Sequence, residues 1–266
     1  MEIYYTIVPL FFLAALFHSS VGFGGGSSYL AIMAIFLVPY QTMPIIALIC
    51  NIIVVTGGVY LYYKSNHIKI FDIIPFVIGS IPLSYLGGKI SIDKNIFLIL
   101  LACTLLVASF NLIFFNSEKR HELKKRYLKK QINRGVDEDR PFVNFIFNMS
   151  IGAFIGFISG LVGIGGGIFL SPLLYLIGWG YAKKISATAS VFILVNSIAG
   201  LSGQIVKNGF HFSVELMTIL PLCLAVFIGG QLGSRLGIFK LSELVLKRIT
   251  AMIAFMAGIR ILIHVV

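Results

Sequence analysis

The sequence predicts an all-α polytopic membrane protein built from two similar halves, and three observations lead to this fold class. Hydrophobic residues make up 58% of the chain and charged residues only 12%, about half the charged fraction of ordinary soluble domains. The hydrophobic residues gather in long blocks, and a glycine-rich motif occurs twice, at 21–26 and at 162–167. The composition therefore argues against a soluble globular fold.

The apolar blocks have the length that a membrane requires, since a spanning helix needs about 20 residues. The first block lacks the basic start of a cleaved secretion signal and its apolar run is too long for one, so we expect it to remain in the mature protein. The predicted blocks are 4–40, 42–63, 70–90, 96–115, 142–179, 185–206, 214–238 and 244–266.

An internal repeat divides the chain. When the glycine motifs are superposed, further matches follow in the same order with small slips, which ancestral duplication explains better than chance. The matches are Asn51 with Asn196, Pro75 with Pro221, and 86–89 with 232–235. We expect a first repeat at 1–115, a linker at 116–141 and a second repeat at 142–266.

The net charge is +11, and nine of the 21 basic residues lie in the connector between the halves, together with five acidic residues. Such a cluster beside apolar blocks is typical of a cytoplasmic loop that follows the positive-inside rule. It predicts no nucleic-acid partner, although a contact with anionic membrane lipids stays an alternative. We therefore expect a multi-pass protein of a cell membrane, such as a bacterial inner membrane, with linker 116–141 in the cytoplasm.

Blocks 4–40 and 142–179 are too long for one straight span and must be divided. Glycine lets the backbone leave helical geometry without steric cost, so 22–26 and 163–167 are the predicted breaks, and each block either continues across the bilayer or folds back. If both fold back, the halves are inverted and only Lys89, Lys94 and Lys207 of the loop basic residues lie outside. The positive-inside rule favours this re-entrant arrangement, with three full spans in each half.

Each glycine motif precedes an apolar helical run, and a helix start attracts anions through its N–H groups and its dipole. Two such starts pointing inward would bind an anion without a charged side chain. The alternative is that the glycines serve only close helix packing. The duplication in over-long blocks favours binding, and the candidate residues are Gly24, Gly25, Gly26, Gly165, Gly166 and Gly167.

Polar side chains gather beside the first motif. Hydroxyls at membrane depth often bond to a carbonyl of their own helix, so those of Ser19, Ser20 and Ser27 are either such local donors or substrate ligands. His18 differs because a titratable group at that depth is costly and usually functional. It could donate to an anion or carry a coupling proton.

The asparagines at equivalent places in the second and sixth blocks are further candidates. A buried amide needs partners on both sides, so Asn51 and Asn196 mark either interhelical bonds or ligand contacts. The run 186–190 adds Thr188 and Ser190 near Asn196.

The sequence lacks the residue patterns that metal binding and intramembrane catalysis require. The cysteines are isolated in apolar blocks with no metal spacing, and no HExxH pattern or deep carboxylate pair is present. We expect no cofactor and no metal site, and an intramembrane enzyme is the less favoured class.

The chain resembles the TauE/SafE family of sulfite and organosulfonate permeases. The resemblance rests on 22–26 and 163–167, on Ser171 and Pro172, and on the run 183–190. The first half departs from the pattern because it lacks a clear basic and Ala-Thr-Ser run before Asn51. The resemblance implies a secondary transporter of small sulfur oxyanions or sulfonates, with a direction that differs between members.

An anion channel of the same architecture is the alternative to an alternating-access carrier, because a broken-helix pore uses the same elements. A carrier shows saturable flux that substrate on the opposite side stimulates. A homodimer is also compatible with the sequence.

Overall fold

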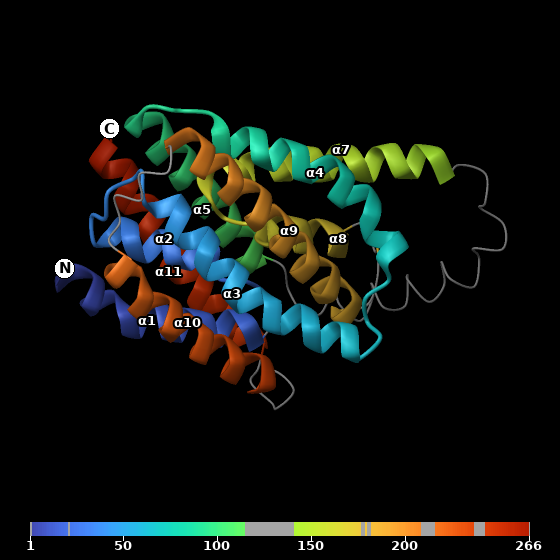
Figure 1. Cartoon of the computed structure of the whole chain (residues 1–266), viewed down its shortest axis with the longest axis horizontal. Helices are drawn as coiled ribbons and strands as arrows, with labels where there is room; N and C mark the ends of the chain where they lie inside the picture. Colours follow the sequence, from blue (N-terminus) through green and yellow to red (C-terminus); the bar gives the residue numbers. More distant parts are fainter. Residues whose placement is uncertain are drawn as a thin grey trace.

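The computed structural model describes residues 2–20, 22–114, 141–176, 179, 182–208, 216–236 and 243–265. Within these residues it contains ten α-helices and no strand, so the predicted all-helical class is confirmed (Figure 1). The first half holds α1 (Glu2–Ser20), α2 (Gly26–Ile35), α3 (Met43–Lys64), α4 (Ile70–Lys89) and α5 (Lys94–Phe114). The second half holds α7 (Pro141–Val162), α8 (Gly167–Leu176), α9 (Ala182–Asn208), α10 (Leu216–Leu236) and α11 (Glu243–Val265).

Several helices are long and apolar enough to cross a bilayer. Within the described ranges the segments that meet this requirement are Met43–Lys64, Ile70–Lys89, Phe145–Val162 and Lys183–Lys207. The predicted linker falls outside the described residues, except for Pro141, where α7 begins.

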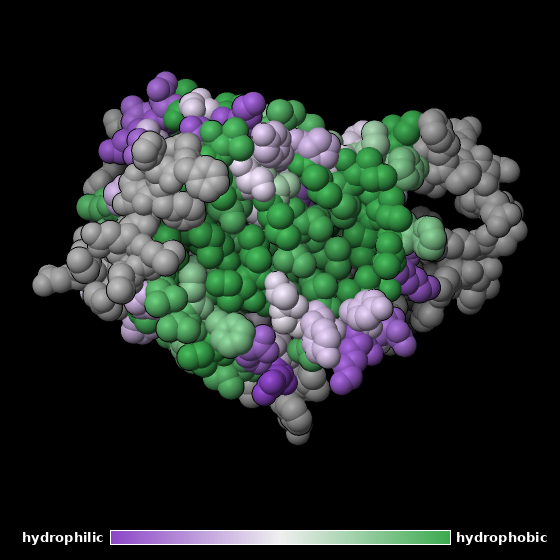
Figure 2. Space-filling model, in the orientation of Figure 1, coloured by the Kyte–Doolittle hydropathy of each residue, from purple (hydrophilic) through white to green (hydrophobic). Residues whose placement is uncertain are grey.

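The surface agrees with a membrane environment. A broad apolar area covers the middle of the face in Figure 2, and hydrophilic residues lie toward its edges. Many large apolar side chains of the described residues are exposed, including Phe154 at 68% and Met252 at 66%. A soluble monomer rarely exposes so much contiguous apolar surface, and together with the spanning helices this shows a multi-pass membrane protein.

Both predicted breaks are present. Helix α1 ends at Ser20 and α2 begins at Gly26, while α7 ends at Val162 and α8 begins at Gly167. Each of α2 and α8 has 10 residues, so each is about 15 Å long and covers about half of the hydrocarbon core.

Small residues bring helices of different halves into backbone contact. A Cβ on Gly152 of α7 would lie 2.2 Å from the Phe76 carbonyl oxygen of α4, and one on Gly160 would lie 2.0 Å from the Ser84 oxygen. Since the contact advances in the same sense along both chains, α4 and α7 run parallel. This close approach needs glycine, as in small-xxx-small packing of membrane helices.

The same kind of contact joins α1 to α10. A Cβ on Gly229 of α10 would lie 2.5 Å from the Phe12 oxygen of α1, and one on Gly233 would lie 2.1 Å from the Leu16 oxygen. Helices α1 and α10 therefore run parallel as well.

The inner helices complete the set of directions. Helix α4 runs parallel to α9, because Asp72 and Lys184 form an ion pair near their starts and the Ser84 hydroxyl donates to the Asn196 carbonyl oxygen at 2.9 Å farther along. Helices α3 and α9 are antiparallel, since Gly58 faces Ser190 while Gly200 faces Leu48.

Helices α3 and α10 run parallel, as Figure 1 shows. Residues near the middle of α3 face the middle of α10, with Gly230 against Val54 and Gly57 against Gln231. We call the end where α4, α7 and α9 begin the linker end, and the end where they finish the far end. Helices α1, α3 and α10 begin at the far end (Figure 1).

Candidate functional site

The first glycine break produces an uncapped helix start. Gly22 and Gly25 have φ of 84° and 93°, a left-handed conformation that other residues adopt only with strain. Gly25 is the N-cap of α2 and no side chain caps the helix. The first backbone bond of α2 runs from the Tyr29 N–H to the Gly25 oxygen at 3.0 Å. The N–H groups of 26–28 therefore form the positive end of the helix without an intrahelical acceptor.

The second break repeats this conformation. Gly163, Gly165 and Gly166 have φ of 86°, 83° and 80°. The N–H groups of Phe169 and Leu170 both reach the Gly166 oxygen at 3.1 Å. The N–H groups of 167 and 168 thus lead α8 without an intrahelical acceptor.

The two breaks meet at one side chain, Asn51 of α3. Its Nδ2 donates to the Ile164 carbonyl oxygen of the second break at 3.0 Å. A Cβ on Gly24 would lie 2.6 Å from Asn51 Oδ1, and a Cβ on Gly26 would lie 2.5 Å from both Asn51 Nδ2 and the Ile164 oxygen. Glycine is required here because the backbones of two distant segments approach within van der Waals contact of each other and of Asn51.

Unpaired polar atoms line this junction. Asn51 Oδ1 and the hydroxyls of Tyr29, Ser159 and Ser197 are buried and have no hydrogen-bond partner within the described protein. A Cβ on Gly25 would contact Tyr29, one on Gly165 would contact Ser197, and one on Gly166 would contact Ser159. Buried polar atoms are nearly always paired, so these groups are candidate partners for a bound molecule or a water.

Tyr29 and Ser197 were not among the residues predicted from the sequence. Tyr29 is fully buried on α2, and its ring stacks on Phe11 with centroids 4.8 Å apart. A tyrosine within an apolar run is a usable signal, because its hydroxyl needs a partner once the ring is buried. Ser197 directly follows Asn196, but only the fold shows that it faces Gly165.

His18 joins the end of α1 to the start of α2. Its Nδ1 donates to the Ala14 carbonyl oxygen at 2.9 Å, so the proton lies on Nδ1. Its Nε2 lies 3.4 Å from the Ser28 hydroxyl in the first turn of α2. The imidazole is buried beside the first break, which places the one titratable candidate next to a helix start.

The neighbouring serines behave differently from His18. Ser19 donates to the Leu16 oxygen at 3.3 Å and Ser20 to the Phe17 oxygen at 2.7 Å. Both hydroxyls thus bond to their own helix, which is the first of the two possibilities given for them, a local donor rather than a substrate ligand. Ser27 is buried in the first turn of α2 and stays a candidate by position.

The run on α9 contacts the first break through one residue. The Ser190 hydroxyl carries one proton and lies within donating distance of two carbonyl oxygens, at 2.7 Å from that of Gly22 and 2.8 Å from that of Ser186. Thr188 is buried on the same helix. Asn196 donates to the Phe192 oxygen of its own helix at 2.9 Å, while its Oδ1 is unpaired. Asn196 therefore does not repeat the contact that Asn51 makes.

The junction contains no acidic side chain among the residues named above, and no group of three or more metal-binding side chains occurs in the described part of the chain. Its available donors are hydroxyls and helix-start N–H groups. This set suits a small anion, since such donors stabilise negative charge without a buried cation.

Comparisons with known proteins agree with this picture. The chain is 30% identical over 253 residues to the probable membrane transporter protein y4hK of Sinorhizobium fredii, which covers 95% of both chains. It is 26% identical to the probable membrane transporter protein YunE of Bacillus subtilis over 86% of both chains. No solved structure matches the chain. The family model described as sulfite exporter TauE/SafE matches residues 7–261, and this chain therefore belongs to the TauE/SafE family of membrane transporters.

Proposed function

We propose that the protein is a secondary transporter of small sulfur-containing anions, such as sulfite, thiosulfate or an organosulfonate, and that the anion binds between the two glycine breaks. The observation that carries this proposal is the junction at Asn51, where the starts of two helices lie close to buried hydroxyls that have no partner in the described protein. The family description supplies the sulfur chemistry, and the donors of the junction suit an anion.

The helix directions support an inverted arrangement of the two halves. Helices α1 and α3 run the same way, so the chain between them has to return through α2, and we infer a re-entrant hairpin at the first break. By sequence position α1, α3 and α4 match α7, α9 and α10. Each matched pair runs in opposite directions, which is the arrangement of an inverted repeat.

The distribution of basic residues fits the same arrangement. Lys64 ends α3 and Arg235 lies in the last turn of α10, both at the linker end. Lys89 and Lys207 lie in the last turns of α4 and α9, at the far end. With the linker in the cytoplasm, the linker end is cytoplasmic and the far end faces outside.

Alternating access requires the junction to open. The Asn51 bond to Ile164 and the tight contact of Gly26 with the same carbonyl close it. We infer that this state is occluded, and that transport separates the two breaks by movement of one half against the other.

The unpaired hydroxyls allow a direct test of the proposed anion site with the purified protein. Ser159→Ala and Ser197→Ala remove hydroxyls that have no hydrogen-bond partner among the described residues, so we expect an unchanged or higher melting temperature. Sulfite binding should weaken about tenfold, the usual effect of losing one hydrogen bond to a charged ligand. Ser109→Ala is the control, because that buried hydroxyl bonds to the Leu106 oxygen of its own helix at 2.9 Å.

Flux measurements on the protein in sealed vesicles separate a carrier from a channel. We expect saturable sulfite uptake that is stimulated by sulfite inside the vesicle. An anion flux far above the turnover rate of a carrier would contradict the carrier and would instead indicate a channel of the same architecture. Equal sulfite affinity in Ser159→Ala, Ser197→Ala and the unmodified protein would contradict the proposed position of the anion.

A further inference from the structure

A buried lysine, Lys184, lies at the linker end in the first turn of α9 and is only 6% exposed. It forms an ion pair with Asp72 in the first turn of α4, whose side chain is 41% exposed. Its ammonium group also lies 4.4 Å from the centroid of the Trp179 ring. We call these three residues the clasp. The dipole of α4 favours an acid at its start, but the dipole of α9 disfavours a lysine there, so helix ends alone do not explain the pair.

Trp179 connects the clasp to the end of α8. Its N–H donates to the Leu174 carbonyl oxygen, in the last turn of α8, at 3.0 Å. Its ring meets Phe76 of α4 edge to face, with centroids 6.1 Å apart and planes at 79°. The clasp therefore joins α4 of the first half to α8 and α9 of the second half.

An apolar cluster lies between the clasp and the second glycine break. Trp179 packs against this cluster. Within the cluster, the Phe192 ring lies 2.8 Å from the position of a Cβ on Gly166. The route from the linker end to the junction between α4, α8 and α9 is thus closed by the clasp and by this cluster. The buried members of the cluster are Phe76, Ile155, Leu170, Leu174, Ile185 and Phe192.

Helices α4 and α9 are held together differently at their two ends. Near the far end their backbones touch, since a Cβ on Gly203 of α9 would lie 2.2 Å from the Tyr85 oxygen of α4. At the linker end the same helices are joined through the ends of the Asp72 and Lys184 side chains. Side-chain ends can separate without disturbing backbone packing, so these helices can part at the linker end while the far end stays fixed.

The first half has no counterpart of the clasp. The match of Pro75 with Pro221 aligns Asp72 with Thr218. The glycine and asparagine matches align Lys184 with a residue between 39 and 43, a range that contains no charged residue. The ion pair is therefore a property of one half and not of the repeat.

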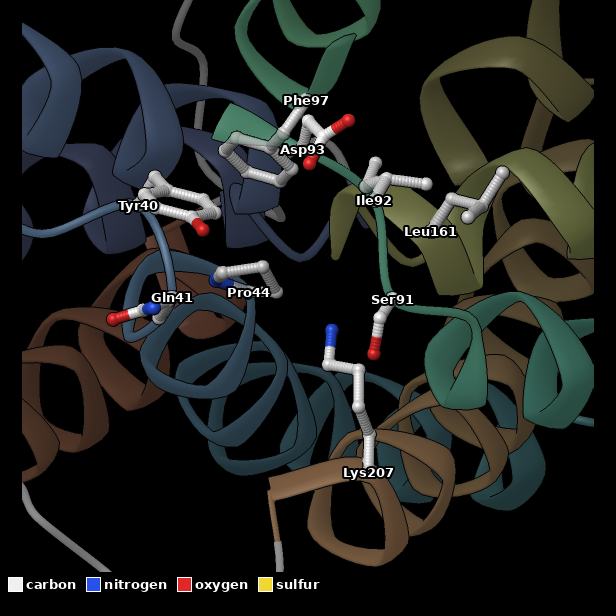
Figure 3. A pocket seen from close by; sticks show the side chains of 9 residues that line it. All are labelled: Tyr40, Gln41, Pro44, Ser91, Ile92, Asp93, Phe97, Leu161 and Lys207. Carbon is white, nitrogen blue, oxygen red and sulfur yellow. The ribbon is translucent and has the colours of Figure 1, made fainter. Parts of the chain in front are cut away.

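The far end, where the counterpart would lie, is hollow instead. A cavity of about 330 Å³ lies there between the α2–α3 and α4–α5 connections (Figure 3). Lys207 and Asp93 lie on different walls of this cavity, and among the described residues no ion pair joins them. The two ends of the molecule are thus closed by different contacts.

We propose that the clasp is the gate at the linker end, which holds α4 against α9 in the occluded state and opens to connect the junction with that side. This inference rests on the proposed alternating access. A partly exposed ion pair is weak, which suits a contact that breaks in every cycle. Both charges become hydrated when the helices part, so neither is left buried without a partner. Because the first half lacks the pair, the clasp favours closure of the linker end over closure of the far end.

The rate at which a buried thiol is labelled measures how often this gate opens. Ala189 is fully buried on α9, and its carbonyl oxygen lies 3.8 Å from the position of a Cβ on Gly167 at the second break. We place Ala189→Cys in the full chain without native cysteines and add a membrane-impermeant maleimide to inside-out vesicles, where the linker end faces the medium. Asp72→Asn should speed labelling about two- to fivefold, the factor that corresponds to loss of a partly exposed ion pair.

Two comparisons separate a gate from general charge or packing effects. Lys183→Gln is the matched control, because Lys183 is exposed beside Lys184 on the same turn of α9, and it should leave the labelling rate unchanged. Exchanging the charges with Asp72→Lys and Lys184→Asp should restore slow labelling, since the pair forms again. Equal labelling rates in Asp72→Asn, Lys183→Gln and the parent chain would overturn the proposal.

The chain carries its own second reporter of the gate. Trp179 is the only tryptophan of the sequence, so the fluorescence of the purified protein without added probes reports on the clasp. We expect Asp72→Asn and Lys184→Gln to shift its emission to longer wavelength and to increase quenching by acrylamide, and Lys183→Gln to do neither. High salt should speed labelling of the parent chain but not of Asp72→Asn, because only the parent has a pair to screen.

The outcomes also separate this proposal from the proposed function, because labelling requires no sulfite. If labelling depends on Asp72 while vesicles show no sulfite flux, the clasp is a gate and the proposed substrate is wrong. If sulfite flux is saturable and depends on Ser197 while labelling is the same in every clasp variant, the transport proposal stands and the gate proposal fails. A monodisperse elution profile shows that each variant is folded.

Discussion

The two glycine breaks share one motif, but their surroundings differ. The first break is held by His18 and Ser28 and by Ser190, which donates to the Gly22 oxygen. The second break is held by Asn51, which donates to the Ile164 oxygen, and Pro44 at the start of α3 lies against its Gly163. A duplicated motif has therefore produced two similar backbones with different chemical neighbours.

The two asparagines show the difference most directly. Asn51 reaches across to the break of the other half, whereas Asn196 bonds to the Phe192 oxygen one turn before it. If the halves exchange conformations during alternating access, the opposite state has Asn196 bonded to the first break and Asn51 bonded to its own helix. The asymmetry then describes one state of the cycle rather than a permanent difference between the halves.

The largest expected effect concerns the orientation of the halves. In a variant without native cysteines, Lys89→Cys and Arg235→Cys place thiols at exposed, sequence-equivalent ends of α4 and α10. We expect a membrane-impermeant maleimide to label Lys89→Cys in intact cells and Arg235→Cys only after permeabilisation. Labelling of both from the same side would rule out the inverted repeat.

The next largest effect concerns the contact between the breaks. A Cβ on Gly26 would lie 2.5 Å from the Ile164 oxygen, so Gly26→Ala should lower the free energy of unfolding by about 1–3 kcal/mol and abolish sulfite flux. The control is Gly58→Ala, because the nearest atom to a Cβ there lies 4.0 Å away. That variant should be neutral or more stable by up to about 1 kcal/mol, since alanine favours helix. Thermal unfolding and vesicle flux measure both; equal stabilities would show that the breaks separate readily.

A smaller effect distinguishes the two asparagines. Asn51→Ala leaves the buried Ile164 oxygen without its donor, which should cost about 1–3 kcal/mol of unfolding free energy. Asn196→Ala should cost less, because the Phe192 oxygen stays within its own helix and already accepts the backbone bond expected there. Melting temperatures in detergent measure the difference, and a larger loss for Asn196→Ala would mean that a different state predominates in solution.

The smallest effect concerns the titratable group of the first break. His18→Gln keeps a side-chain donor near the Ala14 oxygen but cannot change its charge between about pH 5 and 8. We expect sulfite flux to lose part of its pH dependence, while Ser159→Ala at the equivalent place in the second half leaves the pH profile unchanged. An identical profile in His18→Gln and the unmodified protein would remove His18 as a proton carrier.

Composition and block length were sufficient to predict the helical membrane class, because a bilayer demands about 20 apolar residues for each span. The breaks at 22–26 and 163–167 were also predictable, since the blocks are too long to be straight and glycine alone adopts the left-handed conformation without strain. The sequence suggested His18 beside the first motif and Asn51 as either an interhelical or a ligand contact, and the structure shows both next to the breaks. Ser19 and Ser20, in contrast, bond to their own helix, and no sequence signal separates that choice from ligand binding.

The positions where helices form and break follow from the sequence, because hydrophobic length and backbone conformation are local properties. The meeting of the two breaks at Asn51, and the burial of Ser197 and Tyr29 beside them without a described partner, depend on the packing of the helices. These features depend on helices from different halves approaching through small residues such as Gly152 and Gly233. Such contacts join segments more than 70 residues apart, and their partners are set by packing rather than by any local pattern.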